Sequence, residues 1–402
     1  MKPLLPEAPV SVFPLFFTQV FILLFLFLAL LYDVVELTLF SLIILTMSLG
    51  SYLWSRISLN HVKCNIELNR LRLFPGEKLK IGIRAINSKL FPVRVGVNLF
   101  VPRAISGSDT GQWISEETGL LWYQQSVFIS ELCPNKRGVY DLGPPRLRGG
   151  DLFGFFSRKK VAAEQFEIVV YPRIVNIRPI LIPKKEFYGI PGARSPVEDP
   201  IYVFGTRDYQ PGRPARGIHW KASARHHRLQ EKLCEPAEQE KVLILLDVDQ
   251  FETEPAREDF EGCLEVIASL VLQMDLRGIA IGFVTNAHIH GGRPKIIPIS
   301  RSPMQMQAIL ETLARTKTKK KPDPIMDIVS KGYNIPWGVS CLYFTDQISE
   351  QTRAASAVMN HRRIPIRFIL AKGSNALEMP EDSKGENIWY FKHLLFKEDS
   401  KR

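Results

Sequence analysis

The chain has 402 residues, of which 46% are hydrophobic, and it carries a formal net charge of +11. This hydrophobic content excludes disorder along the whole chain, and the length is sufficient for roughly two or three domains with separate cores. The five cysteines are scattered and form no Cys-x-x-Cys pair, which excludes a zinc ribbon and gives no sign of a disulfide framework. The basic balance leaves nucleic acid, membrane surfaces and acidic partners open as binding partners.

An apolar block covers residues 13–54 and contains only two charged residues, Asp33 and Glu36. A membrane-spanning helix needs about 20 apolar residues. The block is long enough for two, so it predicts spanning helices over residues 14–32 and 35–54. A carboxylate is unfavourable at the centre of a bilayer, and we therefore place Asp33 and Glu36 in the turn between the helices.

The residues around this anchor, 1–55, predict its orientation. Lys2 precedes the first helix, and Arg56 and Lys63 follow the second. By the positive-inside rule both ends lie in the cytoplasm. A cleaved signal peptide ending near Ala29 is the alternative, but no Ala-x-Ala site follows it. We expect a two-pass protein of the inner (cytoplasmic) membrane, with its N-terminus and its soluble domains facing the cytoplasm.

Residues 62–172 have the pattern of short strands. The segments 78–87 (KLKIGIRAIN) and 93–101 (VRVGVNLFV) alternate apolar and polar residues, and turn signals such as Pro75-Gly76 separate the strands. No long helical period intervenes. The pattern predicts a β-sandwich (Ig-like) domain, and a crossed-sheet barrel would give a similar one.

Buried strands and helices alternate over residues 241–372. The runs 241–248 (KVLILLDV) and 339–346 (VSCLYFTD) are continuously apolar until their last residues, and a helical period covers 262–278. This alternation predicts an α/β domain with a doubly wound parallel sheet. The remaining residues, 373–402, are expected to be a polar C-terminal tail.

Carboxylates follow two of these predicted strands. Asp247 and Asp249 come after the first strand of the α/β domain, and Asp346 comes after a later one. Ligands bind beyond the carboxyl ends of parallel strands, where such carboxylates could hold Mg²⁺. In the alternative interpretation they cap helices or accept hydrogen bonds from backbone amides. Phe251 lies where a hydroxyl would complete a metal site.

The densest basic cluster, residues 205–232, lies in a predicted connecting segment, 173–240. Its cations, with Trp220 among them, could bind an anion or a partner surface. They could equally pair with carboxylates in a structural latch in which Trp220 packs between domains. Catalysis by His219 has no diagnostic nucleophile or orienting acid beside it. The chain also has no P-loop, His-Glu-x-x-His or Gly-x-Ser-x-Gly signature.

The basic cluster resembles the core motif of the bacterial "domain of unknown function 58" family. Upstream tracts at 137–144 and 151–156 are similar to that family's preceding segment. The resemblance covers most of the chain, including the N-terminal hairpin. The residues that carry the motif here are Arg207, Tyr209, Gly212, Arg216, His219, Trp220, Lys221 and Arg225.

The resemblance implies a C-terminal domain similar to von Willebrand factor type A domains, association with MoxR-type AAA+ ATPases, and no assigned enzymatic activity. The type A metal site has the pattern Asp-x-Ser-x-Ser with a later Asp. Asp247 and Asp346 match its acids, but Asp249 and Phe251 replace the two serines. Arg213 is a second departure, since the family usually has Asp there.

Together these features predict a membrane-anchored, non-enzymatic interaction or adaptor protein that acts with a MoxR-type AAA+ ATPase in envelope-related assembly or maturation. Its partners would be that ATPase and the lipid bilayer, and we expect no cofactor. The second hypothesis is a membrane-tethered protein that binds nucleic acid or another polyanion. An enzyme of unrecognised type is the third.

Overall fold

The computed structural model describes most of the chain, and its contacts divide the chain into two units. Unit 1 comprises Met1–Ile174, Ile289–Arg293 and Leu310–Lys317, and unit 2 comprises the remainder. The described residues are 16–106, 111–151, 155–179, 198–210, 215–236, 240–251, 254–318, 323–332, 335–336, 338–371 and 388–395.

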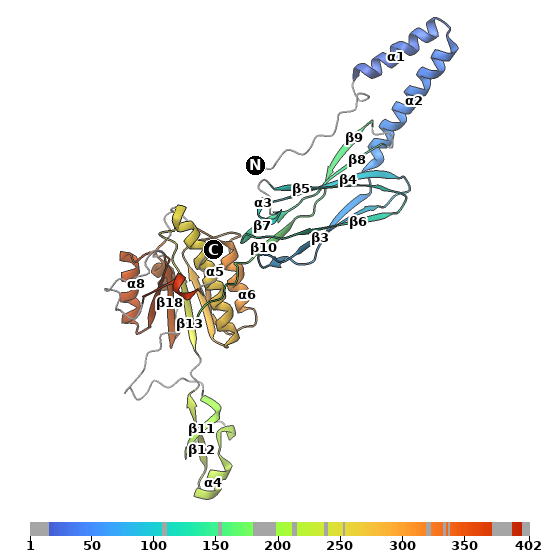
Figure 1. Cartoon of the computed structure of the whole chain (residues 1–402). Helices are drawn as coiled ribbons and strands as arrows, with labels where there is room; N and C mark the ends of the chain where they lie inside the picture. Colours follow the sequence, from blue (N-terminus) through green and yellow to red (C-terminus); the bar gives the residue numbers. More distant parts are fainter. Residues whose placement is uncertain are drawn as a thin grey trace. The chain divides into compact units, whose positions relative to one another are not determined.

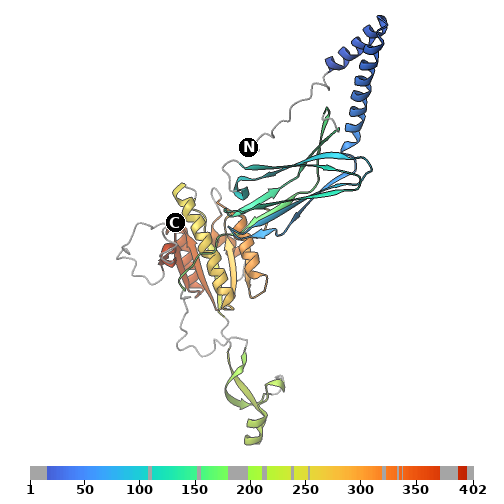
Figure 2. The ribbon, with the colours of Figure 1, turned by 45° about the vertical axis from the view of Figure 1, so that its right-hand side comes forward.

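Two apolar helices open unit 1, α1 (Phe16–Leu31) and α2 (Val35–Ser58). They form an antiparallel hairpin (Figure 2), closed by the amide of Val34, which donates to the carbonyl of Ala29 at 3.1 Å. By length and composition α2 is able to cross a membrane, whereas α1 is shorter. Two helices therefore lie where the sequence predicts two spanning segments, and among the described residues only α2 is long and apolar enough to span. Residues 14–15 lie outside the described part. The second helix continues four residues beyond its predicted end.

The strands predicted over residues 62–172 form three sheets around one apolar core (Figure 1). Along β3 and β4 every second residue is buried, so one face of each strand packs into the core. A short helix, α3 (Arg103–Ser106), follows β4. The sheets are β1-β3-β6 (Val62–Leu68, Leu79–Asn87, Gln125–Leu132), β5-β4-β8-β9 (Gln112–Leu120, Val93–Val101, Arg146–Gly150, Ser157–Val161) and β2-β10-β7 (Arg72–Leu73, Phe166–Val170, Gly138–Leu142).

The C-terminus of α2 is held by lysines of this β-domain. The ammonium of Lys89, in the β3–β4 turn, donates to the carbonyl of Ile57 at 2.6 Å and also to that of Ser58. Lys160 of β9 lies 3.3 Å from the carbonyl of Val62. Burial, together with the charge of Lys160, lowers the pKa of Lys89 to about 8. Cations are favourable at the carbonyl end of a helix, so Lys89 fixes the helix to the domain.

We expect Lys89→Met to loosen the last turn of α2. The substitution keeps the apolar stem and removes two charge-assisted hydrogen bonds, a loss of about 1–2 kcal/mol. Hydrogen exchange of the amides at 56–60 in detergent should become roughly ten-fold faster. Lys159→Met, at an exposed position of β9, is the matched control. Equal exchange in both variants would show that Lys89 does not hold the helix.

Part of unit 1 comes from distant sequence. The last residues of α6 (Gln305–Arg315) and β17 (Thr316–Lys317) belong to it, together with Ile289 of the strand β15 (His288–Ile289), which pairs with β17. Arg137, at the start of β7, donates to the carbonyls of Leu313 and Thr316, each at 2.8 Å. Arg137 thereby satisfies carbonyls that the end of a helix leaves unpaired. This contact gives the upstream motif tract 137–144 a structural role.

Unit 2 contains a six-stranded sheet in the order β16-β14-β13-β18-β19-β20. All neighbouring strands pair in parallel except β16 at the edge. Buried residues occupy both faces of β13 and β18, as expected when helices cover both sides. The strands are β13 (Lys241–Leu246), β14 (Ala280–Thr285), β16 (Ile296–Ser300), β18 (Val339–Thr345), β19 (Ile366–Leu370) and β20 (Ile388–Tyr390), and the helices are α5 (Glu254–Leu276), α7 (Ile325–Gly332), α8 (Glu350–His361) and α9 (Phe391–Leu394), besides the start of α6.

The predicted alternation of buried strands and helices over 241–372 is therefore present, but the boundary needs a correction. The range 373–402, expected to be a polar tail, contains β20 and α9. Strand β20 extends the sheet beside β19, and Phe391 and Leu394 are buried. The apolar run from Ile388 to Phe391 is short and lies in a polar stretch, and the pairing of β20 with β19 is what makes it part of the domain.

Candidate functional site

The family-like motif lies on a β-hairpin with a helix at its end (Figure 1). Strands β11 (Glu198–Asp208) and β12 (Gln230–Pro236) pair antiparallel, and the single turn η1 (Ala215–Gly217) and α4 (Trp220–His226) lie between them. The segment predicted as a connector over 173–240 thus contains a hairpin of its own. Arg207 is on β11, Tyr209 follows it, and Lys221 and Arg225 are on α4, whereas Gly212 and the side chain of Arg216 lie outside the described residues.

His219 is the N-cap of α4. Its Nδ1 accepts a hydrogen bond from the backbone amide of Ala222 at 3.1 Å. The hydroxyl of Ser223 then accepts the amide of Gln230 at 2.8 Å and joins the helix to β12. Both motif residues therefore shape the hairpin. Histidine is not among the usual N-cap residues, so this role could not be recognised from the residue type.

We expect His219→Ala to destabilise α4 by about 1 kcal/mol, because the N-cap acceptor is lost. His219→Asn keeps an acceptor at the same position and should retain most of the helix. Hydrogen exchange of the amides at 221–224 measures the difference between the two variants. If both variants exchange alike, the imidazole does not cap the helix.

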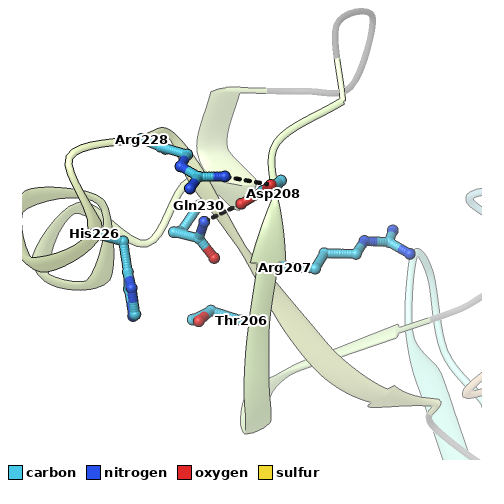
Figure 3. Close-up of a pocket in the computed structure, with 6 residues that line it drawn as sticks. All are labelled: Thr206, Arg207, Asp208, His226, Arg228 and Gln230. Atoms are coloured by element: carbon cyan, nitrogen blue, oxygen red, sulfur yellow. Dashed lines mark hydrogen bonds and ion pairs between the residues drawn. The ribbon is translucent and has the colours of Figure 1, made fainter.

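The two faces of the hairpin hold different ion pairs. On one face the guanidinium of Arg207 pairs with Glu231, whose side chain is buried. On the other face Asp208 accepts a hydrogen bond from Gln230 and lies 3.7 Å from Arg228. Figure 3 shows Arg207 directed away from the remaining side chains. The pairing follows the register, since Arg207 is opposite Glu231 and Asp208 is opposite Gln230.

A polar hollow of about 350 Å³ lies on the face that carries Asp208 (Figure 3). It is lined by Thr206, Arg207, Asp208, His226, Arg228 and Gln230. Asp208 accepts a hydrogen bond from Gln230 and forms an ion pair with Arg228. The hollow is therefore suited to binding a polar group, and its described hydrogen bonds include no nucleophile paired with a base.

The outer surface of α4 combines an aromatic side chain with cations. Trp220 is 68% exposed, and Lys221, Arg225 and Arg228 are exposed as well. A latch in which Trp220 packs between domains would bury this indole. Large exposed aromatic residues and arginines are typical of binding surfaces. Trp220 is therefore uncovered within its own hairpin, and the composition of this surface is of the kind that partners or anions bind.

Asp247, the first residue of the predicted metal site, is buried in a hydrogen-bond network at the end of β13. Its Oδ1 accepts from Asn286 Nδ2 at 2.7 Å and from the amide of Asp249 at 3.2 Å. Its Oδ2 accepts from the hydroxyl of Tyr343 at 2.6 Å. Burial, reinforced by the Asp247 charge, raises the pKa of Tyr343. Both carboxylate oxygens are therefore engaged by protein donors.

The remaining residues do not complete a magnesium site. Phe251 is buried and packs on Phe260, with ring centroids 5.4 Å apart. It offers no oxygen where the type A pattern has a serine. Asp346 is buried and accepts from Gln347 at 3.2 Å. Within the described part of the chain, no three His, Cys, Asp or Glu side chains form a group that could hold a metal. The donor set thus does not fit a metal-dependent site.

Asn286 and Tyr343 are the residues of this network that the sequence analysis missed. Asn286 follows β14 as Asp247 follows β13, so the rule that carboxyl ends of parallel strands meet at one edge could have identified it. Tyr343 lies within a buried strand, where only its hydroxyl marks it as polar. Both side chains are uncharged, so neither stands out in the sequence as a candidate site residue.

Comparison with known proteins gives little further information. No family model matches the chain. The uncharacterized protein YeaD of Bacillus subtilis is 23% identical over 252 residues, which cover 62% of this chain and 61% of YeaD. The chain thus matches less than two thirds of that relative's length.

The solved structures that are similar include two small domains, each matching over about a quarter of the chain. A CARDB domain of the PF1109 protein of Pyrococcus furiosus has a TM-score of 0.21 at 14% identity, covering 27% of this chain and 91% of that domain. The cupredoxin domain of amoB from Nitrosocaldus yellowstonii has a TM-score of 0.21 at 13% identity, covering 28% and 89%. Scores this low bear on neither the fold nor the function of this chain.

Proposed function

We propose that this protein is a membrane-anchored, non-enzymatic adaptor that binds a MoxR-type AAA+ ATPase through the surface around Trp220 and acts in envelope-related assembly or maturation. The observation that carries the proposal is the exposed indole of Trp220 beside the exposed cations Lys221 and Arg225. The ATPase is proposed as the partner because the motif resembles that of the domain of unknown function 58 family. Membrane anchoring is supported by the length and apolar composition of α2.

The proposal includes a two-pass topology with the soluble domains in the cytoplasm. The helical hairpin supports it, together with Arg56 in the last turn of α2 and the cations that follow the helix, beginning with Lys63. It also includes a type A-like C-terminal domain, supported by the parallel sheet and by Asp247 at the end of β13. We expect no Mg²⁺ binding by calorimetry on the full chain in detergent, because Asp247 already accepts three hydrogen bonds.

Capture from solubilised membranes tests the adaptor function. The tagged full chain should retain an AAA+ ATPase, and Trp220→Ala should reduce this retention strongly, since aromatic anchors dominate binding energy. Leu229→Ala, at another exposed apolar side chain of the same hairpin, is the matched control. No ATPase among the specific partners, or equal retention by both variants, would contradict the proposal.

Binding of a polyanion is the second candidate, favoured by the exposed cations of α4 and by Arg228. Contacts with phosphates make affinity fall steeply as salt increases. The full chain in detergent would then retain a labelled single-stranded oligonucleotide at low salt, and Lys221→Ala would weaken the binding. No retention at low salt would remove this candidate and leave the adaptor function untouched.

A further inference from the structure

Large apolar side chains are exposed at one end of the β-domain, in two turns that we call the tip, residues 89–92 and 121–124. Trp122 is 60% exposed and Tyr123 is 71% exposed. Leu90, Phe91 and Leu121 are exposed too. Five neighbouring apolar side chains of this size are unusual on a surface that faces only water. We therefore expect the tip to contact another molecule or a membrane.

The tip is built as one rigid unit. Asn87, at the end of β3, is buried, and its Nδ2 donates to the carbonyl of Phe91 at 2.9 Å and to that of Leu121 at 2.7 Å. The amide of Tyr123 also donates to the carbonyl of Lys89 at 3.3 Å. One buried amide thus joins both turns and holds their side chains outward. The exposure is a consequence of the fold rather than of a loose loop.

The tip lies beside the last turn of α2. The rings of Phe91 and Trp54 meet edge to face, with centroids 5.4 Å apart. The ammonium of Lys89 reaches the carbonyl of Ile57 at 2.6 Å. Arg56 lies over the ring of Tyr52, at 5.4 Å from its centroid. The tip is therefore at the level of α2 where aromatic and basic residues follow the apolar span.

We propose that the tip inserts its apolar side chains into the lipid–water interface of the bilayer that α2 crosses. Tryptophan and tyrosine prefer this interface, where an apolar ring and a polar group are both satisfied. The adjoining Arg56 suits the phosphate layer of the headgroups. The inference rests on the proposed membrane anchoring, and it adds a second contact that fixes the orientation of the β-domain against the membrane.

Depth-dependent quenching of a fluorophore tests the proposal in the full chain. Cys133, which is exposed, and Cys234, whose side chain lies outside the described residues, are replaced by serine. Cys64 and Cys341 are buried, and burial raises their pKa to about 11 and about 12. Their thiols react slowly with maleimides, as does the buried Cys263. Single cysteines added to this background then carry a bimane label.

Three positions are compared in phosphatidylcholine–phosphatidylglycerol vesicles that contain nitroxide lipids. Trp122→Cys reports on the tip, with Leu90→Cys as a second probe there. Leu42→Cys reports on the apolar part of α2, two turns from its start. Ile129→Cys reports on an exposed position of β6, roughly 20 Å along the strand from the tip. We expect shallow nitroxides to quench the tip, deep nitroxides to quench position 42, and neither to quench position 129.

The outcomes separate this inference from the anchoring on which it rests. Quenching at 42 together with unquenched labels at 90 and 122 would overturn insertion of the tip and leave the anchor in place. A label at 42 that no nitroxide quenches would overturn the anchor itself. Tip labels that are protected from a water-soluble quencher but not reached by nitroxides would indicate a protein on the tip, and would overturn the lipid assignment.

Discussion

Leu245→Asp is expected to unfold the sheet of unit 2. Leu245 is fully buried in β13, which pairs with β14 on one side and β18 on the other. Its side chain belongs to an apolar cluster that includes Tyr343 and Met359. An unpaired carboxylate there loses its hydration and gains no partner, a loss of several kcal/mol. Such a loss is comparable to the whole stability of a domain, about 5–15 kcal/mol.

Thermal unfolding followed by far-ultraviolet circular dichroism measures this effect in detergent. Leu245→Met conserves volume and apolarity, and it should lower stability by less than about 1.5 kcal/mol. Lys241→Asp, at the partly exposed start of the same strand, controls for the charge. If Leu245→Asp retains the cooperative transition of the parent chain, β13 is not a central strand.

The elements of the sheet were predictable because their signal is local. A parallel strand covered on both faces is a continuous apolar run, as in β13 and β18. The edge strand β20 has only three residues, and its assignment depends on pairing with β19. The hairpin β11–β12 was missed for a related reason, since β12 is mostly polar and its assignment depends on pairing with β11.

In the candidate sites, too, features that depend on local sequence were visible and features that depend on distant residues were not. The sequence leaves the cluster around Trp220 open as a contact surface or a structural latch, because its cations and aromatic residue are visible in the sequence but their exposure is not. The network at Asp247 was not predicted in detail, because Asn286 and Tyr343 reach it from other strands. Arg137 donates to a carbonyl 176 residues away. Partners at such separations are determined by the tertiary fold.

Arg315→Met should destabilise unit 1 more than any single change at its surface. Arg315 is 4% exposed at the end of α6, and its guanidinium reaches Glu167 at 3.1 Å and Glu311 at 3.1 Å. Glu311 is itself buried, and Arg72 and Arg293 contact it at 3.0 and 3.2 Å. Removal of Arg315 leaves a buried carboxylate with fewer donors, at a loss of about 2–4 kcal/mol.

Two controls isolate the buried network. Arg94→Met breaks the exposed pair of Arg94 with Glu117, 2.9 Å apart, and should change stability by about 0–1 kcal/mol. Arg315→Met combined with Glu311→Leu removes both charges, and it should be less destabilised than Arg315→Met alone. If Arg315→Met alone is as stable as Arg94→Met, Arg315 is not needed to neutralise Glu311.

The effect of Arg315→Met should also depend on pH. The hydrogen bond from Arg315 holds the pKa of Glu167 below its ordinary range, which is about 4.3 in unfolded chains. A carboxyl with a lowered pKa stabilises the fold fully above its unfolded pKa, and this contribution is lost as the pH falls through the folded pKa. The parent chain should therefore lose more stability than Arg315→Met between about pH 5 and pH 3. Thermal midpoints of both chains across this range would converge on acidification, and a constant difference would show that the pairing with Glu167 contributes nothing to stability.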